Sequence, residues 1–338
     1  MSISIAQVIS LPLGKVIETY PRSADFFANI GLEIPERTLP LLDAVAKIDA
    51  EALSELGLER HQIFRDYCQF IDVFCINVRS SPRIESLQVI GGAGKDGQAE
   101  LPEFEIRKGE VVSIVGPTGS GKSRLLADIE CLACGDTVTR RVIKINGKNI
   151  EDSDRDLLEG RLVAQLSQNM NFVMDLSVAD FLQMHAQSRM VDNGVETVKK
   201  CYECAVSLAG EKFDLKTKVT QLSGGQSRAL MIADAAFMSD SPIVLIDEIE
   251  NAGIDRRQAV QLLVKAEKLV LMSTHDPLLA LSANRRIVIH NGAIIKVIET
   301  CFEEKKCLGM IEEIDTKLSM VRSQLRQGES VSLQKLRG

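Results

Sequence analysis

The sequence lacks any run of about 18 or more consecutive apolar residues, so we expect no segment of it to span a bilayer by itself. It also lacks an excess of basic residues, because 47 Asp and Glu outnumber 40 Lys and Arg and give a net charge of −7. Proteins that bind nucleic acid usually carry a basic stripe or patch. We therefore expect no direct nucleic acid partner.

The amino-terminal segment is apolar over residues 1–14, but it lacks the positive charges that open a secretory signal peptide. Without such a leader, the eight cysteines are expected to be reduced thiols in the cytoplasm, not a framework of disulfides. The predicted localisation is cytoplasmic, and association with a membrane through a partner is the alternative.

The patterning of apolar residues divides the chain into three predicted regions. Apolar positions recur at helical spacing over residues 1–78, which predicts a small all-helical domain. In the region 79–298, two short apolar runs flank a turn-rich segment at 91–98 and predict a β-hairpin. Strand-like runs then alternate with helical segments, including one helical stretch over about 177–208. This alternation predicts a parallel α/β sheet.

The carboxy-terminal region 299–338 is predicted to be a helical tail. Apolar residues recur there at spacings of three and four, namely Leu308, Ile311, Ile314, Leu318, Val321 and Leu325. This spacing gives one apolar stripe along a helix. The simpler interpretation is that the stripe packs back onto its own domain, and pairing with another chain is the alternative.

The stretch "GPTGSGKS" at 116–123 follows a predicted strand and opens a predicted helix, which is the context that a nucleotide-binding P-loop requires. Glycines let the backbone turn tightly so that its N–H groups point at phosphate oxygens, and the helix N-terminus adds its positive dipole end. Lys122 supplies a point charge to the β- and γ-phosphates, and Ser123 offers a hydroxyl to Mg²⁺. The residues predicted to bind the nucleotide here are Gly116, Pro117, Thr118, Gly119, Ser120, Gly121, Lys122 and Ser123.

A second part of the site is predicted at the end of "PIVLIDE", where an apolar run carries Asp247 and Glu248 to the carboxyl end of a strand. Ligands of open α/β sheets bind at that edge. We expect Asp247 to support Mg²⁺ and Glu248 to orient and deprotonate an attacking water.

The P-loop is followed in order by "LSGGQ", "LIDE" and "STHD", and over roughly residues 83–298 the chain resembles an ATP-binding-cassette (ABC) ATPase. The resemblance implies an α/β fold with a parallel sheet core, an antiparallel β subdomain and a helical subdomain, and hydrolysis of ATP with Mg²⁺. It also implies that Gln168 contacts Mg²⁺ and takes part in catalysis, and that His275 is a catalytic residue that contacts the γ-phosphate. Asp255, in the loop between two protomers, is implied to be an ATP-binding residue.

The same resemblance gives the signature stretch "LSGGQ" a receiving role. In this family it closes on the γ-phosphate of ATP that the P-loop of the other subunit holds. The residues implied are Ser223, Gly224, Gly225 and Gln226. Because one chain carries one P-loop and one signature, we predict a homodimer with two composite ATP sites.

Two stretches depart from the usual pattern of the family. The aromatic residue that stacks on adenine is not evident ahead of the P-loop, where "RIESLQV" offers Arg83 and Ile84, so selectivity for adenine stays open. The stretch "IENAGID", which contains Asp255, is similar to the corresponding part of the soluble cassette ATPase in the sulfur-mobilisation machinery that assembles iron–sulfur clusters.

Two Cys-x-x-Cys pairs lie in predicted helical regions, Cys131 with Cys134 and Cys201 with Cys204. On a helix each pair places both sulfurs on one face, and four such sulfurs satisfy Zn²⁺ or an iron–sulfur cluster if the fold brings them together. Cysteines that pack between helices are the simpler interpretation, and a redox pair is the third.

The amino-terminal module resembles the small helical domains attached to iron–sulfur and hybrid-cluster proteins, and we expect a docking role for it. Its stretch "GLEIPER" has no cysteine, so a metal role has no support. Together these features favour an ATPase whose conformational change acts on a soluble partner, such as a metallocofactor or redox protein. The alternative is the ATP-binding subunit of a membrane transporter whose permease is a separate polypeptide.

Overall fold

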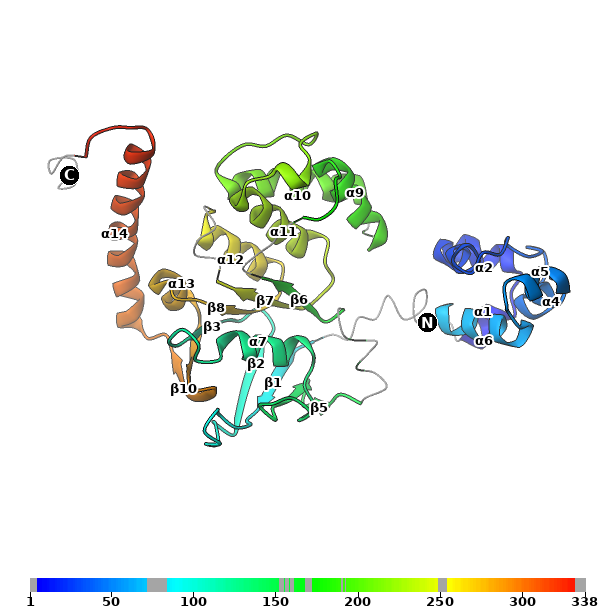
Figure 1. The fold of residues 1–338 in the computed structure, drawn as a ribbon, viewed down its shortest axis with the longest axis horizontal. Coiled ribbons are helices and arrows are strands. Elements are labelled where there is room, and N and C mark those ends of the chain that lie inside the picture. The colour runs from blue at the N-terminus through cyan, green and yellow to red at the C-terminus, as the bar shows by residue number, and fades with distance from the viewer. Residues whose placement is uncertain are drawn as a thin grey trace. The chain divides into compact units, whose positions relative to one another are not determined.

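The computed structural model divides into two units, Met1–Arg83 and Ile84–Gly338 (Figure 1). The predicted domain boundary at residue 78 lies outside the described residues. The residues that the structure describes are 5–71, 84–151, 155, 158, 161–167, 172–189, 191, 193–248 and 254–331.

The first unit is helical over its described residues, as its apolar spacing predicts. Three aromatic rings form the centre of its core, because the ring centroids of Phe26 and Phe27 lie 5.4 Å apart and both rings lie close to Tyr67. Ile63, Tyr67 and Ile71 are buried at intervals of four residues, which places them on one helix face. The helices are α1 (Ile5–Ile9), α2 (Leu13–Thr19), α3 (Asp25–Asn29), α4 (Leu41–Ala46), α5 (Ala50–Glu55) and α6 (Arg60–Ile71).

An antiparallel sheet with strands in the order β2, β1, β4, β5 opens the second unit. β1 and β2 pair with Ser86 opposite Arg107, so the predicted hairpin around the glycine-rich segment is confirmed. Leu87 and Val89 are buried and alternate with partly exposed residues along β1, as a half-buried strand requires. The strands are β1 (Ser86–Ile90), β2 (Glu103–Arg107), β4 (Val142–Ile145) and β5 (Lys148–Asn149).

The central sheet has six strands in the order β10, β9, β3, β8, β7, β6, and all neighbours are parallel except β9 and β10. β3, β7 and β8 are buried along most or all of their length, which is typical of parallel strands covered on both faces. β7 and β8 pair with Asp247 opposite Ser273, so their carboxyl ends lie side by side. The strands are β3 (Val111–Val115), β6 (Val163–Leu166), β7 (Ile243–Asp247), β8 (Leu269–Ser273), β9 (Arg285–His290) and β10 (Ala293–Glu299).

Helices cover the two faces of the central sheet around separate cores. One core joins both sheets around α7 (Lys122–Glu130), which lies between them in Figure 1. The other core lies beneath a group of helices, in which α10 packs on α9 and α11. The predicted helical stretch over 177–208 is two helices here. The helices of this group are α9 (Val178–Ser188), α10 (Gly194–Ala209), α11 (Gly224–Phe237) and α12 (Arg256–Lys265).

The tail forms one long helix, α14 (Phe302–Arg326), which packs against α13 (Pro277–Ser282). Ion pairs hold it to the domain, including Arg286 with Glu304 and Arg256 with Asp315. The expectation that its apolar stripe packs back onto the domain is wrong for Ile314, Leu318 and Leu325, which are 57%, 49% and 61% exposed. The helix attaches through a mixed face instead, on which the half-buried Leu308 and Ile311 lie beside the ion-paired Glu304 and Asp315. No helix among the described residues has both the length and the hydropathy to cross a membrane.

This attachment predicts that the exposed stripe adds little to folding. Replacing Ile314 and Leu318 together by Ser is expected to change the free energy of unfolding by less than about 0.5 kcal/mol, because neither side chain leaves a core. As a control, Leu279→Ala in α13 removes a fully buried side chain and is expected to cost about 2–5 kcal/mol. Urea unfolding of the nucleotide-free chain measures both, and a loss above about 2 kcal/mol for the serine variant contradicts the assignment.

Candidate functional site: a nucleotide pocket

The P-loop connects β3 to α7 and ends at Gly121, the N-cap of α7. Gly121 has a φ of +108°, and a Cβ there would lie 3.1 Å from the Cα of Gly292. Both facts require glycine. The loop backbone and the N-terminus of α7 therefore meet at Gly121, and their N–H groups and the helix dipole favour binding of an anion there.

The Lys122 side chain lies over this loop and is almost fully buried. Its ammonium donates hydrogen bonds to the carbonyl oxygens of Gly116 at 3.1 Å and Pro117 at 3.3 Å. It also lies 2.9 Å from Nε2 of His275. Lys122 of the P-loop and His275, two positions beyond β8, are thus in direct contact, although 153 residues separate them in the sequence.

Glu248 and His275 follow the adjacent ends of β7 and β8. His275 Nε2 lies 3.4 Å from Glu248 Oε1, and both side chains remain partly exposed. Glu248 has a φ of +49°, which is uncommon outside glycine, and its N–H donates to the Ser273 carbonyl at 3.1 Å. Strained backbone of this kind concentrates at functional sites because it fixes the direction of a side chain.

Asp247 and Ser123 provide oxygen atoms of the type that Mg²⁺ prefers. Oδ1 of Asp247 is buried and has no hydrogen-bond partner among the described residues. A buried acceptor without a partner calls for a ligand. Ser123 is exposed to the pocket, so the donor set fits a magnesium ion bound between the P-loop and β7. Gln168, the other residue predicted to contact Mg²⁺, lies outside the described residues.

A pocket of about 590 Å³ opens in front of the P-loop. This volume is in the range of sites that hold small molecules. Predicted site residues that line it are Thr118, Gly119, Gly121, Lys122, Ser123 and Glu248. Other lining residues were not predicted from the sequence, and they are Ala93, Gly94, Lys95, Arg124, Val138, Thr139 and Gly292.

The signature stretch forms the N-terminus of α11 and does not contribute to the lining of this pocket. Ser223 is the N-cap in a capping box: the N–H of Gln226 donates to Ser223 Oγ, and the N–H of Ser223 donates to Gln226 Oε1. Ser223 and Gly224 are exposed, and a Cβ on Gly224 would meet nothing within 4 Å. An exposed helix N-terminus is suited to an anion that arrives from outside the chain.

Asp255 also caps a helix in this structure. Its carboxylate accepts from the N–H of Gln258 at 3.0 Å at the start of α12, and its own N–H donates to the Leu208 carbonyl at 3.0 Å. Asp255 does not line the pocket. The sequence predicted an ATP contact here, and the contacts within one chain give the residue a capping function.

The two cysteine pairs do not meet. Cys131 ends α7 in the core between the sheets, whereas Cys201 is buried in the core under the helical group. Burial raises the pKa of the Cys131, Cys201 and Cys204 thiols, which disfavours the thiolate that binds metal. No group of three or more metal-binding side chains occurs in the described part of the chain. The hypothesis of one zinc or cluster site on both pairs, with Cys134 as the fourth ligand, is therefore not supported.

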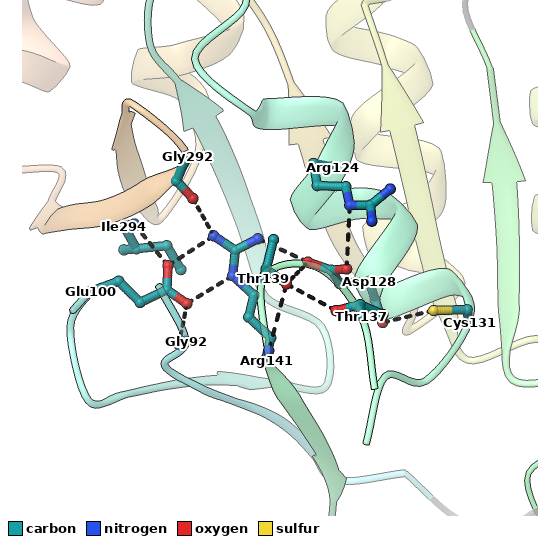
Figure 2. A network of polar contacts seen from close by, with 10 residues as sticks. All are labelled: Gly92, Glu100, Arg124, Asp128, Cys131, Thr137, Thr139, Arg141, Gly292 and Ile294. Carbon is teal, nitrogen blue, oxygen red and sulfur yellow. Dashed lines mark hydrogen bonds and ion pairs between the residues drawn. The ribbon is translucent and has the colours of Figure 1, made fainter. Parts of the chain in front are cut away.

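A buried ion-pair network centres on Arg141 (Figure 2), and two of its members, Thr139 and Gly292, line the pocket. The guanidinium of Arg141, at the start of β4, is fully buried and binds Glu100 through two hydrogen bonds of 2.8 Å. It also donates to Asp128 on α7 at 2.9 Å and to the Gly292 carbonyl at 2.8 Å. Since the N–H of Gly292 donates to the Ser120 carbonyl at 2.7 Å, the network reaches the P-loop itself.

The Glu100 carboxylate accepts hydrogen bonds from three residues of this network. Besides Arg141, the N–H groups of Gly92 and Ile294 donate to its carboxylate at 2.7 and 2.9 Å. Burial raises the pKa of Glu100, but the hydrogen bonds from Arg141, Ile294 and Gly92 outweigh this effect and hold the pKa below its ordinary value. The ordered, buried charges fix the P-loop helix, β4 and the β9–β10 turn together. No sequence pattern indicated this network, because its members are far apart in the chain.

The two-sheet framework, the P-loop on α7, the acidic pair after β7 and the signature-capped α11 define a P-loop ATPase. The family model described as ABC transporter matches residues 101–251. An uncharacterized ABC transporter ATP-binding protein of Methanocaldococcus jannaschii is 50% identical over 252 residues, which cover 74% of this chain and 95% of that relative. The chain belongs to the family of ABC transporter ATPases.

Other relatives match over a smaller share of their length. The macrolide export ATP-binding/permease protein MacB of Mannheimia succiniciproducens is 34% identical over 205 residues, which cover 56% of this chain and 30% of MacB. MacB of Aggregatibacter actinomycetemcomitans is 32% identical and is covered over 34% of its length. The chain thus spans about a third of the MacB relatives.

Two solved structures share the fold. One is the ATP-binding subunit of an ABC transporter, with a TM-score of 0.51, 19% identity, and coverage of 74% of this chain and 97% of that chain. The other is CbiO1 from Clostridium perfringens, part of the ABC transporter complex CbiONQ, with a TM-score of 0.50, 20% identity, and coverage of 71% and 98%. The fold that the sequence resemblance implies is confirmed.

The first prediction from this site concerns the buried network. Arg141→Met leaves two buried carboxylates without their partner and is expected to lower the free energy of unfolding by about 3–5 kcal/mol. The neighbouring Arg140→Met is the matched control, because Arg140 is exposed, and it is expected to change the value by less than about 0.5 kcal/mol. Urea unfolding measures both variants. Equal stabilities for the two variants would show that the network does not hold the fold.

The second prediction is a pH dependence. Because the pKa of Glu100 is lowered in the folded chain, its stabilising effect is present above the ordinary carboxyl pKa of about 4.3 and is lost as the pH falls through the lower folded value. The stability advantage of wild type over Glu100→Gln is expected to be constant between about pH 6 and 8 and to shrink below about pH 4. Urea midpoints across this range test it, and an advantage that persists unchanged to pH 3 contradicts it.

Proposed function

We propose that this chain is the ATP-binding subunit of a membrane transporter, in which two copies close around two ATP molecules and the permease is a separate polypeptide. The relative from Methanocaldococcus jannaschii is named as an ABC transporter ATP-binding protein, and the MacB relatives are named as ATP-binding/permease proteins. These names favour the transporter alternative over the soluble partner that the sequence features favoured. The proposed location is the cytoplasmic side of a membrane, through the permease.

The observation that carries the dimer is the separation of pocket and signature within one chain. The pocket is lined by the P-loop, Glu248 and neighbouring loops, whereas Ser223 and Gly224 stand exposed at the N-terminus of α11. Each half is suited to the same anion, since both are helix N-termini with convergent N–H groups. A second copy in the family's arrangement brings the signature of one chain to the γ-phosphate held by the other.

The residues of the pocket account for phosphate binding. The P-loop amides and the dipole of α7 face the phosphate chain, and the Lys122 ammonium exchanges its contacts with Gly116 and Pro117 for phosphate oxygens. Ser123 and Asp247 would hold Mg²⁺. When bound, this ion withdraws charge from the oxygens of the β- and γ-phosphates.

Glu248 and His275 account for the attack on the γ-phosphate. The fixed backbone of Glu248 directs its carboxylate to the pocket, where it accepts the proton of the attacking water. His275 lies between Glu248 and Lys122, at 3.4 and 2.9 Å, and is positioned to sense the γ-phosphate that Lys122 binds. Release of phosphate then removes the anion that joins the two copies, and the dimer opens.

The composite site predicts complementation between inactive variants. Lys122→Ala removes the P-loop charge, and Ser223→Arg blocks the exposed signature without crowding its own chain. Each variant alone is expected to lose ATPase activity roughly a hundredfold. A mixture is expected to recover roughly a quarter of wild-type activity. Half of the dimers that form contain one copy of each variant, and each of these dimers has one intact site of two. Absence of recovery from folded variants contradicts the shared site.

The transporter assignment predicts the identity of the partner. Glu248→Gln with ATP and Mg²⁺ is expected to retain, from a detergent-solubilised lysate of the native cell, a membrane protein with several spanning helices. Lys122→Ala, which does not hold the phosphates, is the control and is expected to retain less of it. Capture of a soluble metalloenzyme or assembly factor in its place would return the assignment to the soluble-partner hypothesis.

A further inference from the structure

The loop at residues 91–97, here named the glycine loop, forms one wall of the nucleotide pocket and has little room for side chains. A Cβ on Gly92 would lie 1.8 Å from the Thr139 carbonyl oxygen, and a Cβ on Gly94 would lie 2.9 Å from the Asn291 carbonyl oxygen. Contacts this short exclude larger residues at both positions. The loop packs backbone against backbone, and an aromatic side chain cannot replace either glycine.

The glycine loop is fixed by hydrogen bonds along its length. The N–H of Ala93 donates to the Thr139 carbonyl at 2.9 Å, and the N–H of Lys95 donates to the Asn291 carbonyl at 2.8 Å. The side-chain amide of Asn291 also donates to Asp96 at 2.8 Å. Lys95 therefore extends from a backbone whose position is set by two neighbouring turns.

The Lys95 side chain points to the P-loop. Its ammonium donates to the Gly119 carbonyl at 2.8 Å, and the residue is exposed and lines the pocket. Arg124, another cation of the lining, lies 3.8 Å from Asp128 and is partly neutralised by it. Lys95 thus contacts the middle of the P-loop, whereas Lys122 contacts the start of the loop.

Stacking on the base of a nucleotide requires an aromatic ring in the pocket lining. Among the described residues that line the pocket no side chain is aromatic, and the apolar one of any size is Val138, which is 85% exposed. Stacking on an aromatic ring strengthens binding of a base by about tenfold or more. The phosphate chain is therefore the part of the nucleotide that these lining residues are suited to bind.

We propose that Lys95 is a nucleotide-binding residue that contacts the phosphate chain of the bound triphosphate, and that this pocket recognises phosphate charge with little selection of the base. The inference rests on the proposed ATP site and adds a residue and a specificity to it. A fixed cation costs little ordering on binding, so its attraction to phosphate appears in affinity. The site accepts nucleoside triphosphates as a class.

Binding of ATP, GTP and CTP tests this by calorimetry, in Glu248→Gln so that turnover does not distort the titration. The three dissociation constants are expected to agree within about threefold, and Lys95→Ala is expected to raise all of them by roughly tenfold. Lys95→Arg keeps the charge and is expected to restore most of the affinity. Lys148→Ala, on exposed β5 outside the pocket lining, is the matched control and is expected to change nothing.

Salt provides an independent measurement, because a contact with phosphate is screened by ions. As the salt concentration rises, affinity for ATP is expected to fall more steeply in the chain that keeps Lys95 than in Lys95→Ala. If Lys95→Ala leaves tight nucleotide binding unchanged, only the proposed role of Lys95 is overturned. If ATP binds more than about tenfold more tightly than GTP and CTP, the proposed lack of base selection is overturned. Absence of all nucleotide binding overturns both this inference and the proposed function.

Discussion

The close approach of three backbone segments, 91–95, 116–121 and 291–292, is the constraint on which the site depends. A phosphate cradle made of N–H groups works only if the loop that carries them holds its shape. Here that shape is fixed from outside the loop, because the N–H of Gly292 donates to the Ser120 carbonyl and the Lys95 ammonium donates to the Gly119 carbonyl. Glycine at the contact points makes the approach possible, since a Cβ would lie 2.9 Å from the Asn291 carbonyl oxygen at Gly94 and 3.1 Å from the Cα of Gly292 at Gly121.

The Arg141 network supplies the second half of this constraint. Charges buried without partners are costly, so one guanidinium, two carboxylates and the N–H groups around them have one low-energy arrangement. That arrangement joins β4, α7 and the β9–β10 turn (Figure 2). The P-loop helix is therefore held to the antiparallel sheet by hydrogen bonds as well as by the apolar core between them. Movement of the P-loop relative to β4 would break several charged hydrogen bonds at once, which explains how a loop of small residues keeps a defined shape.

Much of the fold and the motif residues could be predicted from the sequence, because buried strands, glycine turns and the P-loop are local patterns. The contact of Lys122 with His275 follows from the motifs only once the order of strands is known, since it depends on β3, β7 and β8 being neighbours. Glu100 and Arg141 could not be predicted, because a charged residue in the sequence normally indicates the surface. The spacing of the cysteine pairs also fits a metal site, but the fold places them in separate cores, in agreement with the simpler interpretation that they pack between helices. The stripe on α14 predicted a helix correctly but its packing only in part. Leu308 and Ile311 are half-buried on the face that carries Glu304, whereas Ile314, Leu318 and Leu325 are exposed.

One chain carries the residues that we propose to hold the phosphates and to catalyse hydrolysis, and its signature is exposed at the start of α11. The central claim is that a second copy completes the site, with ATP as the link between the two. Light scattering of Glu248→Gln, which we expect to bind ATP without hydrolysing it, tests this claim most directly. The account predicts a mass of one chain without nucleotide and of two chains with saturating ATP and Mg²⁺. A mass of one chain at saturating ATP, with binding verified by calorimetry, would contradict it.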